Sequence, residues 1–196
     1  MQKLTQQKFS LSFSKVLTFM LAFPLTFISN VQAHEKTWPE KRLKQAWSTA
    51  QNFTSKQITL SSSQISILTS EGVKIGPEDR SPTFYFAQEK DPTADKSKTL
   101  GVIFFVDAYG ANGLIEISVA MSANGQVNKV DIWNHSENSL IAKEDFLKQF
   151  IGKTAKDSFT STKDYTPVSG ADKASTAIAK AVEKALKITN IVFEKK

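Results

Sequence analysis

Two stretches in the N-terminal half of the chain carry apolar residues at the spacing of a helix. An apolar residue recurs every three or four positions within residues 38–53, while lysine, arginine and glutamine fill the other side, which predicts an amphipathic helix. Residues 61–70 fit a short helix that Ser61 or Ser62 caps. The apolar positions of residues 58–67 fit an alternating strand as well, so the pattern leaves both interpretations open.

Patterns typical of strands fill the middle of the chain. We expect four strands, at residues 83–88, 100–108, 115–121 and 127–134. The second is an almost unbroken apolar run, which predicts cover on both faces, whereas the third alternates and is expected to be covered chiefly on one face. A polar loop at residues 89–98 separates the first two strands. Asn124-Gly125 supplies the pair of positive φ angles for a tight hairpin between the last two.

Helical periodicity returns in the C-terminal third. Residues 143–151 predict a short helix that Gly152 ends. Residues 173–187 form the clearest helical pattern, with a stripe of small apolar residues on one side and lysine and glutamate on the other. We expect residues 188–193 to form a last edge strand. The elements add up to an α+β fold, in which an antiparallel sheet carries helices packed on it and at its ends, in a single domain.

The first 33 residues have the order of a secretory signal peptide. Three lysines precede an uncharged apolar stretch at residues 16–28, and Val31-Gln32-Ala33 follows as a small-residue cleavage site. The apolar stretch is shorter than the roughly 20 residues that span a bilayer, which favours cleavage, while retention as an uncleaved anchor is the alternative. We therefore expect an exported protein, in the periplasm or at the extracytoplasmic face of a membrane.

Composition narrows the chemistry further. The chain of 196 residues contains no cysteine and two histidines, which excludes disulfides, thiolate catalysis, iron–sulfur clusters and cysteine-attached haem. The formal net charge of +6 includes the three lysines of the signal segment and is +3 without them, so we expect no nucleic-acid partner. A zinc site would need to be built almost wholly from carboxylates, so no metal site is expected. Redox chemistry would require an organic cofactor.

A polar cluster stands where the fourth predicted strand ends. It comprises His135, Ser136, Glu137 and Asn138. Trp133 lies just before it on the outward face of the strand, where its ring fits either a core position or a stacking platform. A single histidine at a strand end is more often structural or solvated than functional, so both roles stay open for His135.

The second polar segment, residues 166–173, leads into the helix with the stripe of small residues. A loop that contains glycine and enters a helix presents unpaired backbone N–H groups and the positive end of the helix dipole. Phosphate is the ligand that such a place attracts most. The alternative is an ordinary helix cap, in which Ser169 or Asp172 accepts these N–H bonds and no ligand binds.

Six short motifs occur in a fixed order from residue 125 onward. They are Gly125-Gln126-Val127, Val130-Asp131-Ile132, His135-Ser136-Glu137, Phe146-Leu147-Lys148-Gln149-Phe150-Ile151-Gly152-Lys153, Val168-Ser169-Gly170-Ala171 and Ala177-Ile178. In this order, and behind a signal peptide, the stretch of about residues 100–186 resembles the FMN-binding domain family. That family includes the extracytoplasmic flavin subunit of the sodium-pumping NADH:quinone reductase and many small exported flavoproteins. After the predicted signal peptide (1–33), we expect N-terminal helices with the first strand (34–98) and an FMN-binding-like core (99–196).

The resemblance implies FMN as the cofactor, and a role as an electron carrier rather than as an enzyme with its own substrate. In the family, a His-x-Glu-Thr corner and a Ser-Gly-Ala-Thr loop converge on FMN. The residues implied to bind it here are Trp133, His135, Ser136, Glu137, Asn138, Ser169, Gly170, Ala171, Asp172, Lys173, Ser175 and Thr176. None of them is expected to act as an acid, a base or a nucleophile.

Three positions depart from the family pattern. In the family, the Thr of the loop often carries FMN through a phosphoester bond, and the flavin transferase that attaches it recognises an Asp three residues before the Ser. Here Asn138 replaces the Thr of the corner, Thr166 replaces that Asp, and Asp172 replaces the acceptor Thr. A carboxylate has no hydroxyl to phosphorylate and repels a phosphate dianion. We therefore expect non-covalent FMN, with Lys173 partly offsetting the charge, and no flavin transferase as a partner.

Two other functions stay open. In the second hypothesis, the Asp172 carboxylate occupies the helix terminus in place of the phosphate. The chain is then a degenerate family member that binds no flavin and serves as an interaction module. A flavin-dependent reductase with a small substrate of its own is the third hypothesis. For the electron carrier, the expected partner is a redox protein, membrane-bound or membrane-associated.

Overall fold

The structure is a computed structural model that describes residues 39–90 and 97–193. The predicted signal peptide and the middle of the predicted polar loop therefore lie outside the described residues. Within the two described ranges, no helix combines the length and the apolarity needed to cross a bilayer.

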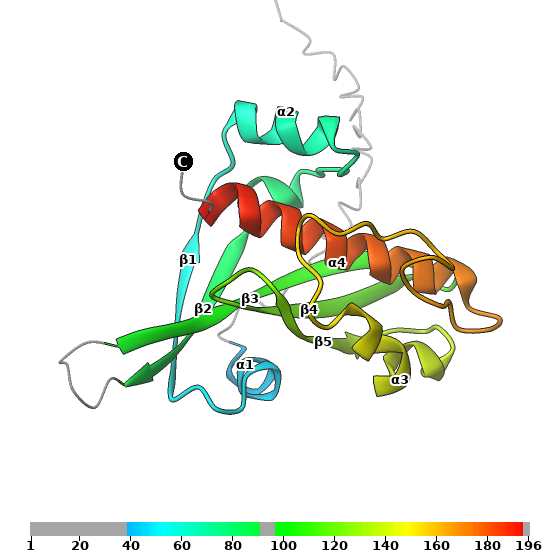
Figure 1. Cartoon of the computed structure of the whole chain (residues 1–196), viewed down its shortest axis with the longest axis horizontal. Coiled ribbons are helices and arrows are strands. Elements are labelled where there is room, and N and C mark those ends of the chain that lie inside the picture. Colours follow the sequence, from blue (N-terminus) through cyan, green and yellow to red (C-terminus); the bar gives the residue numbers. More distant parts are fainter. Residues whose placement is uncertain (1–38, 91–96, 194–196) are drawn as a thin grey trace, which may run out of the picture. The chain divides into compact units, whose positions relative to one another are not determined.

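In the described part of the chain, five antiparallel strands form one sheet in the order in which they occur in the sequence (Figure 1). They are β1 (Asn52–Gln57), β2 (Thr83–Lys90), β3 (Ser97–Tyr109), β4 (Leu114–Ser122) and β5 (Val127–Asn134). The last four are the predicted strands, with β2 and β3 extended into the predicted polar loop. The pattern does not predict β1. The antiparallel sheet with packed helices confirms the α+β class.

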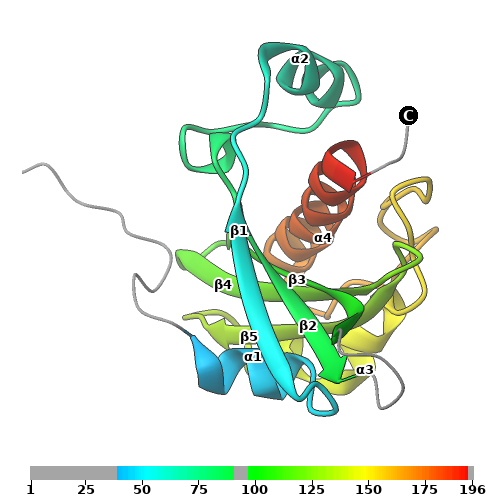
Figure 2. The same cartoon turned by 90° about the vertical axis from the view of Figure 1, so that its left-hand side faces the viewer.

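Helices cover both faces of this sheet. The α-helices are α1 (Glu40–Ala46), α2 (Ser62–Ser70), α3 (Glu144–Leu147) and α4 (Asp172–Phe193), and the 3₁₀ helices are η1 (Glu78–Arg80), η2 (Ser139–Ala142) and η3 (Lys148–Phe150). α4 packs on β3 and β4 from one face, whereas α1 contacts β4 and β5 from the other (Figure 2). The helix predicted at residues 143–151 is α3 followed directly by η3, and Gly152 comes after it with a φ of +80°.

The two faces of the sheet are buried in two separate apolar clusters. The larger cluster joins α4 and α2 to alternate residues of β2 through β5, among them Phe84, Ile117 and Ile178. The smaller cluster packs Leu43 of α1 against Ile103 of β3. Because both clusters draw on β3, the cover on both faces that its apolar run predicts is confirmed.

β4 is also covered on both faces, where its alternating sequence predicts cover chiefly on one. Ser118 and Ala120 point to the α1 face, and each is only 1% exposed. The hydroxyl of Ser118 accepts a hydrogen bond from Nε1 of Trp133 at 2.9 Å. A buried hydroxyl with a hydrogen-bond partner does not require solvent. The polar residue Ser118 is therefore buried, although the alternating pattern predicts it on an exposed face.

The first helix is shorter than the predicted segment of residues 38–53, and the prediction is wrong beyond Ala46. There the chain leaves the helix and turns to begin β1. Trp47 follows α1 with its ring against the backbone of Gly101, where an added Cβ would stand 2.5 Å from the ring. Every residue of β1 then pairs with β2. These bonds are distant in sequence and outweigh the local helical periodicity.

α4 continues without interruption to Phe193, so the edge strand predicted at residues 188–193 is wrong. Ile188 is fully buried. The ring of Phe193 meets Phe84 and Phe86 of β2 edge-on, at centroid distances of 4.9 and 5.7 Å. The β-branched residues of this last stretch favour a strand locally, but the buried and aromatic contacts of the helix override that preference.

α2 confirms the helix at residues 61–70 and contradicts the alternative strand. Ser61 caps it: its hydroxyl accepts from the backbone N–H of Gln64 at 3.3 Å, and the Gln64 side chain accepts from the backbone N–H of Ser61 at 2.9 Å. This reciprocal pair is a capping box. Gln64 also donates to the carbonyl of Ile191 at 3.2 Å, which fastens α2 to α4.

The β4–β5 hairpin turns differently from the predicted pair of positive φ angles. Gly125 has a φ of +81°, but Asn124 does not share it. The N–H of Gly125 donates to the carbonyl of Ser122 at 2.8 Å, so Ala123 and Asn124 are the central residues of the turn. The glycine follows them in the left-handed conformation.

Candidate functional site

The polar corner after β5 is held by its own hydrogen bonds. Nδ1 of His135 accepts from the backbone N–H of Glu137 at 3.2 Å. Oδ1 of Asn138 accepts from the backbone N–H of Leu140 at 3.0 Å, so Asn138 caps η2. The side chains of His135 and Glu137 are half-buried, whereas Ser136 and Asn138 are exposed.

Glu137 reaches from this corner to the turn between β3 and β4. Its carboxylate accepts from the backbone N–H of Asn112 at 2.5 Å and from the Asn112 side-chain amide at 3.3 Å. A Cβ added to Gly110 would stand 2.2 Å from Oε1 of Glu137. The turn is closed by a bond from the N–H of Gly110 to the carbonyl of Gly113 at 2.9 Å. Sequence reasoning missed this contact, and its one signal is the pair of glycines that brackets the turn.

Trp133 lies on the α1 face of the sheet. Its Nε1 bond to Ser118 directs the ring over β4, and the guanidinium of Arg42 stands 5.4 Å from the ring centroid. Arg42 also pairs with Glu116 at 3.0 Å. The ring is therefore a half-buried part of the packing between α1 and the sheet.

The loop before α4 is fastened at both ends. The side-chain amide of Gln149 donates to the carbonyl of Thr166 at 3.2 Å and accepts from its N–H at 2.8 Å. Residues 168–171 form a turn closed by a 2.9 Å backbone bond, in which Gly170 has a φ of +73°. Ser175 is fully buried, and its hydroxyl accepts from the first N–H of that turn at 3.0 Å.

α4 begins with open backbone donors. Within residues 39–90 and 97–193, the N–H groups of Asp172, Lys173 and Ala174 have no hydrogen-bond acceptor. The side chains of Ser169, Asp172 and Lys173 are exposed at the same place. The start of α4 therefore offers three N–H groups, a hydroxyl and an ammonium group as donors, and one carboxylate that opposes an anion.

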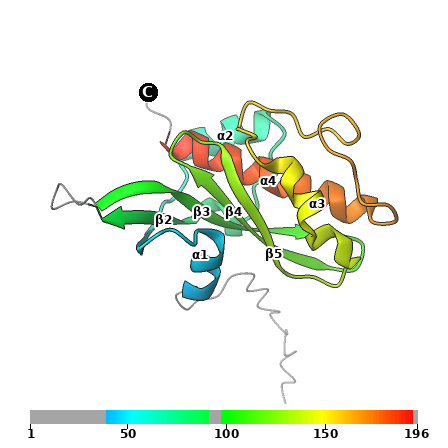
Figure 3. The same cartoon turned by 60° about the horizontal axis from the view of Figure 1, so that its bottom comes forward.

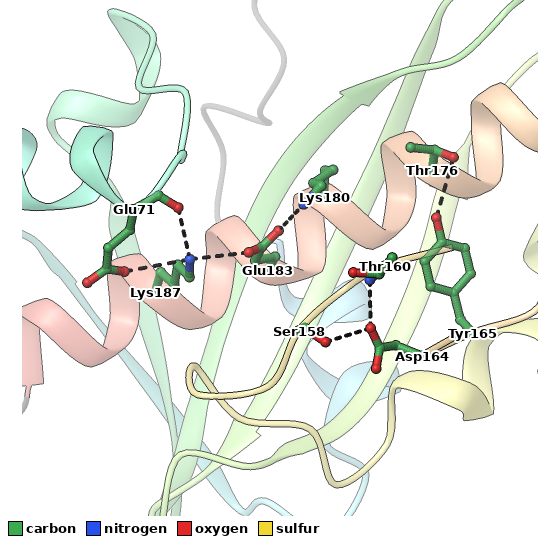
Figure 4. Close-up of polar contacts among 9 residues, drawn as sticks. All are labelled: Glu71, Ser158, Thr160, Asp164, Tyr165, Thr176, Lys180, Glu183 and Lys187. Carbon is green, nitrogen blue, oxygen red and sulfur yellow. Dashed lines mark hydrogen bonds and ion pairs between the residues drawn. The ribbon is translucent and has the colours of Figure 1, made fainter. Parts of the chain in front are cut away.

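Thr176, one turn into α4, contacts the preceding loop. The hydroxyl of Tyr165 donates to Oγ1 of Thr176 at 3.4 Å, as Figure 4 shows. The same loop is tied together by Asp164, whose carboxylate accepts from the hydroxyl of Ser158 at 2.6 Å and from the N–H of Thr160 at 2.8 Å. The hydroxyl of Thr176 thus belongs to the contact that holds this loop on α4.

The structure brings the corner and the loop to the same end of the sheet. Figures 1 and 3 both show the chain after β5 and the start of α4 at that end. In the described chain, no hydrogen bond or ion pair joins residues 135–138 to residues 166–173. Trp133 is not part of this grouping, because its ring lies on the face opposite α4.

Two carboxyl groups of the sheet have raised pKa values, and neither belongs to the predicted set. Burial, together with the negative charges of Glu116 and Glu78, raises the pKa of Asp107 to about 7. Asp107 lies near the end of β3, directly opposite Glu116 of β4. Burial also raises the pKa of Asp131, against the hydrogen bond and charge of Lys129. The signal in the sequence is a single acid within an apolar strand.

An open hollow of about 520 Å³ lies beside α1. It is lined by Gln45, Ala46, Trp47, Ser48, Thr49, Leu100, Asn128 and Lys129. Its strand residues are Leu100 of β3 and Asn128 and Lys129 near the start of β5, whereas the polar corner follows the end of β5. None of the residues predicted to bind FMN lines it, so the hollow and the candidate site are separate places.

Residues 110–187 match the model of a family described as the FMN-binding domain. This stretch of the chain is similar to an FMN-binding domain. The match confirms the resemblance and supports FMN as the cofactor. Among solved structures, NqrC from Shewanella oneidensis matches with 13% sequence identity and a TM-score of 0.49, over 76% of this chain and 87% of the NqrC chain. No curated protein sequence matches the chain.

The matched FMN-binding segment does not contain the whole sheet on which it folds. It supplies β4, β5 and α4 as far as Lys187, six residues short of the end of that helix. β3 precedes the segment, yet it pairs along the whole of β4 and packs against α4. The matched segment therefore packs its core against β3 and other residues that lie outside it, among them Phe84 and Phe104.

Proposed function

We propose that this chain is an exported electron carrier that holds FMN without a covalent bond. The observation that carries the proposal is the set of N–H groups without acceptors at the start of α4, which lies inside the segment matched by the FMN-binding domain family. Unpaired N–H groups and the positive end of a helix favour a phosphate group.

The phosphate of FMN fits the donors at the start of α4. The N–H groups of Asp172, Lys173 and Ala174 would hold it, and the exposed hydroxyl of Ser169 adds a further donor. Gly170 has no side chain to obstruct the approach, and Ala171 is small and buried against the core. The residues present therefore suit a phosphate that is bound but not esterified.

The isoalloxazine ring would lie toward the corner at the same end of the sheet. His135 and Glu137 are the half-buried residues there, beside the exposed Ser136 and Asn138. We leave Trp133 out of the proposed contacts, because its ring is packed on the α1 face. FMN supplies the electron transfer when bound, while the protein holds it and sets its electrostatic surroundings.

The side chains at the start of α4 support non-covalent binding. Asp172 offers a carboxylate where the family has a hydroxyl, and the hydroxyl of Ser175 is fully buried and already bonded. The charge of Asp172 weakens the attraction for a phosphate dianion, and the neighbouring ammonium group of Lys173 offsets part of that repulsion. A flavin transferase is therefore not required.

An exported carrier needs a partner that delivers or removes electrons at the extracytoplasmic side, and we propose a membrane-associated redox protein. Export rests on the signal-like segment of residues 1–33. Fractionation of cells that express the full chain tests it. The expected result is a periplasmic protein whose intact mass corresponds to a first residue of His34. Full-length mass in the cytoplasm would overturn the assignment.

An optical spectrum of the purified protein tests flavin binding. After incubation with FMN and removal of free cofactor, we expect the two flavin absorbance bands. Acid precipitation should then leave the yellow colour in the supernatant, because the flavin is not esterified. A yellow pellet would refute non-covalent binding, and a colourless protein would refute the carrier function.

Two variants separate the carrier from a flavin-free interaction module. Asp172→Asn removes the charge without adding a hydroxyl, and we expect it to bind FMN about tenfold more tightly. Thr166→Asp with Asp172→Thr restores the family pattern. Labelling of this double variant by a flavin transferase, combined with a native protein that stays colourless in FMN, would favour the module.

A further inference from the structure

Gly110 leaves space that Glu137 fills. The carboxylate of Glu137 lies where a side chain at position 110 would stand, with Oε1 only 2.2 Å from an ideal Cβ. The φ angle of Gly110 is not in the left-handed region, so the backbone there is one that any residue adopts. Position 110 therefore requires glycine because a side chain there would collide with Glu137, which follows β5.

The Glu137 carboxylate is engaged by the turn that it enters. Both of its oxygens accept from Asn112, one from the backbone N–H at 2.5 Å and one from the side-chain amide at 3.3 Å. Hydrogen bonds to an ionised acceptor are stronger than neutral ones. The corner after β5 is thus tied to the β3–β4 turn across the end of the sheet.

The backbone N–H of Glu137 in turn fixes the imidazole of His135. It donates to Nδ1 at 3.2 Å, so Nδ1 carries a lone pair in this arrangement. In a neutral imidazole the proton then resides on Nε2, which becomes a hydrogen-bond donor. Glu137 therefore has two roles. Its side chain holds the β3–β4 turn, and its backbone N–H selects the tautomer of the His135 imidazole.

We propose that Gly110, Asn112 and Glu137 form a clamp that positions His135 with Nε2–H as an outward donor. Glu137 is then a positioning residue rather than an FMN contact. If FMN binds as proposed above, Nε2–H of His135 donates a hydrogen bond to one of its oxygen atoms, and this step rests on the proposed function. The clamp itself is a property of the protein without cofactor.

Nitrogen NMR of the ¹⁵N-labelled full chain tests the clamp directly, because the sequence has only two histidines. A His34→Gln variant assigns the second imidazole. In wild-type protein above pH 8 we expect His135 to show Nε2–H as its single tautomer. In Gly110→Ala, which displaces the carboxylate, and in Glu137→Gln, which replaces one acceptor with a donor, we expect both tautomers.

Gly125→Ala is the matched control for Gly110→Ala. Gly125 has a positive φ and open space around it, so alanine there strains the hairpin at the other end of the sheet without touching the clamp. It should lower stability and leave the His135 tautomer unchanged. A single Nε2–H tautomer in both Gly110→Ala and Glu137→Gln would overturn the proposal.

Fluorescence titration with FMN then measures the use of the donor. We expect the Kd to rise about tenfold in Gly110→Ala and in His135→Ala, and to change less than twofold in Gly125→Ala. An unchanged Kd in His135→Ala would refute the FMN contact. Wild-type protein that binds no FMN would refute the proposed function, while the imidazole spectra still decide whether the clamp exists.

Discussion

The carboxyl group of Asp107 makes the stability of the fold depend on pH. Burial, with Glu116 and Glu78 nearby, raises its pKa from 3.8 to about 7 in the folded protein. Folding therefore favours the protonated acid. The stabilisation from this group is fully present below the unfolded pKa of 3.8 and is lost as the pH rises through about 7.

The size of the effect follows from the shift and from the exposure of the side chain. Each pKa unit corresponds to about 1.4 kcal/mol, so the full shift would give about 4 kcal/mol. Asp107 is only half-buried, and solvent screening reduces this to roughly 2 kcal/mol. We therefore expect Asp107→Asn to raise the free energy of unfolding by about 2 kcal/mol at pH 8, and to have little effect near pH 4.

Urea denaturation followed by circular dichroism at pH 4, 5.5, 7 and 8 measures this difference. Asp157→Asn is the control, because the hydrogen bonds from Thr154 lower the pKa of Asp157 and confine its titration to more acidic pH. Above about pH 5, the free energy of unfolding of Asp157→Asn should change with pH in the same way as that of the wild type. A difference between Asp107→Asn and wild type that is the same at pH 4 and pH 8 would show that the carboxyl group is not the cause.

Three further predictions concern packing and charge. Phe193→Ala removes the edge contact with Phe84, and since Phe193 is 39% exposed we expect a loss of about 1–2 kcal/mol in urea denaturation. Lys184→Met leaves Asp79, which is 7% exposed, without its 2.9 Å ion pair; the expected loss of about 2–3 kcal/mol should be absent in the charge-preserving Lys184→Arg. Gly101→Ala places a Cβ 2.2 Å from a backbone carbonyl of β4, so we expect a loss of more than about 3 kcal/mol, visible as a fall in Tm.

The elements that the sequence predicts well are those with a complete local signal. The apolar run of β3 specifies its strand without reference to the rest of the chain, and the capping serines of α2 favour a helix where the apolar pattern alone leaves helix and strand open. The predictions fail where contacts with residues distant in sequence determine the secondary structure. β1 exists because β2 pairs with it, and the last turns of α4 stay helical because Phe193 packs on β2. Neither partner is visible in a local window.

The residues of the candidate site also fall into those with a local sequence signal and those that depend on distant contacts. Ser169 and Gly170 can be found from the sequence, because a glycine loop that enters a helix has a recognisable pattern. The glycines around Asn112 mark a turn, but the role of Gly110 and Asn112 is not specified locally, because it depends on the carboxylate of Glu137, which lies 25 residues after Asn112 and folds back onto the turn. The burial of the Trp133 ring on the α1 face likewise depends on the approach of Arg42.

The meander order of the strands has a consequence for how the protein forms. Each strand pairs with its neighbour in sequence, so sheet formation requires few long loop closures and should be rapid. The 22-residue helix that shields the larger apolar face, however, follows all five strands. During vectorial synthesis the nascent sheet must keep that face uncovered until the helix emerges, so holdase chaperones would find their binding surface there and lose it when α4 docks.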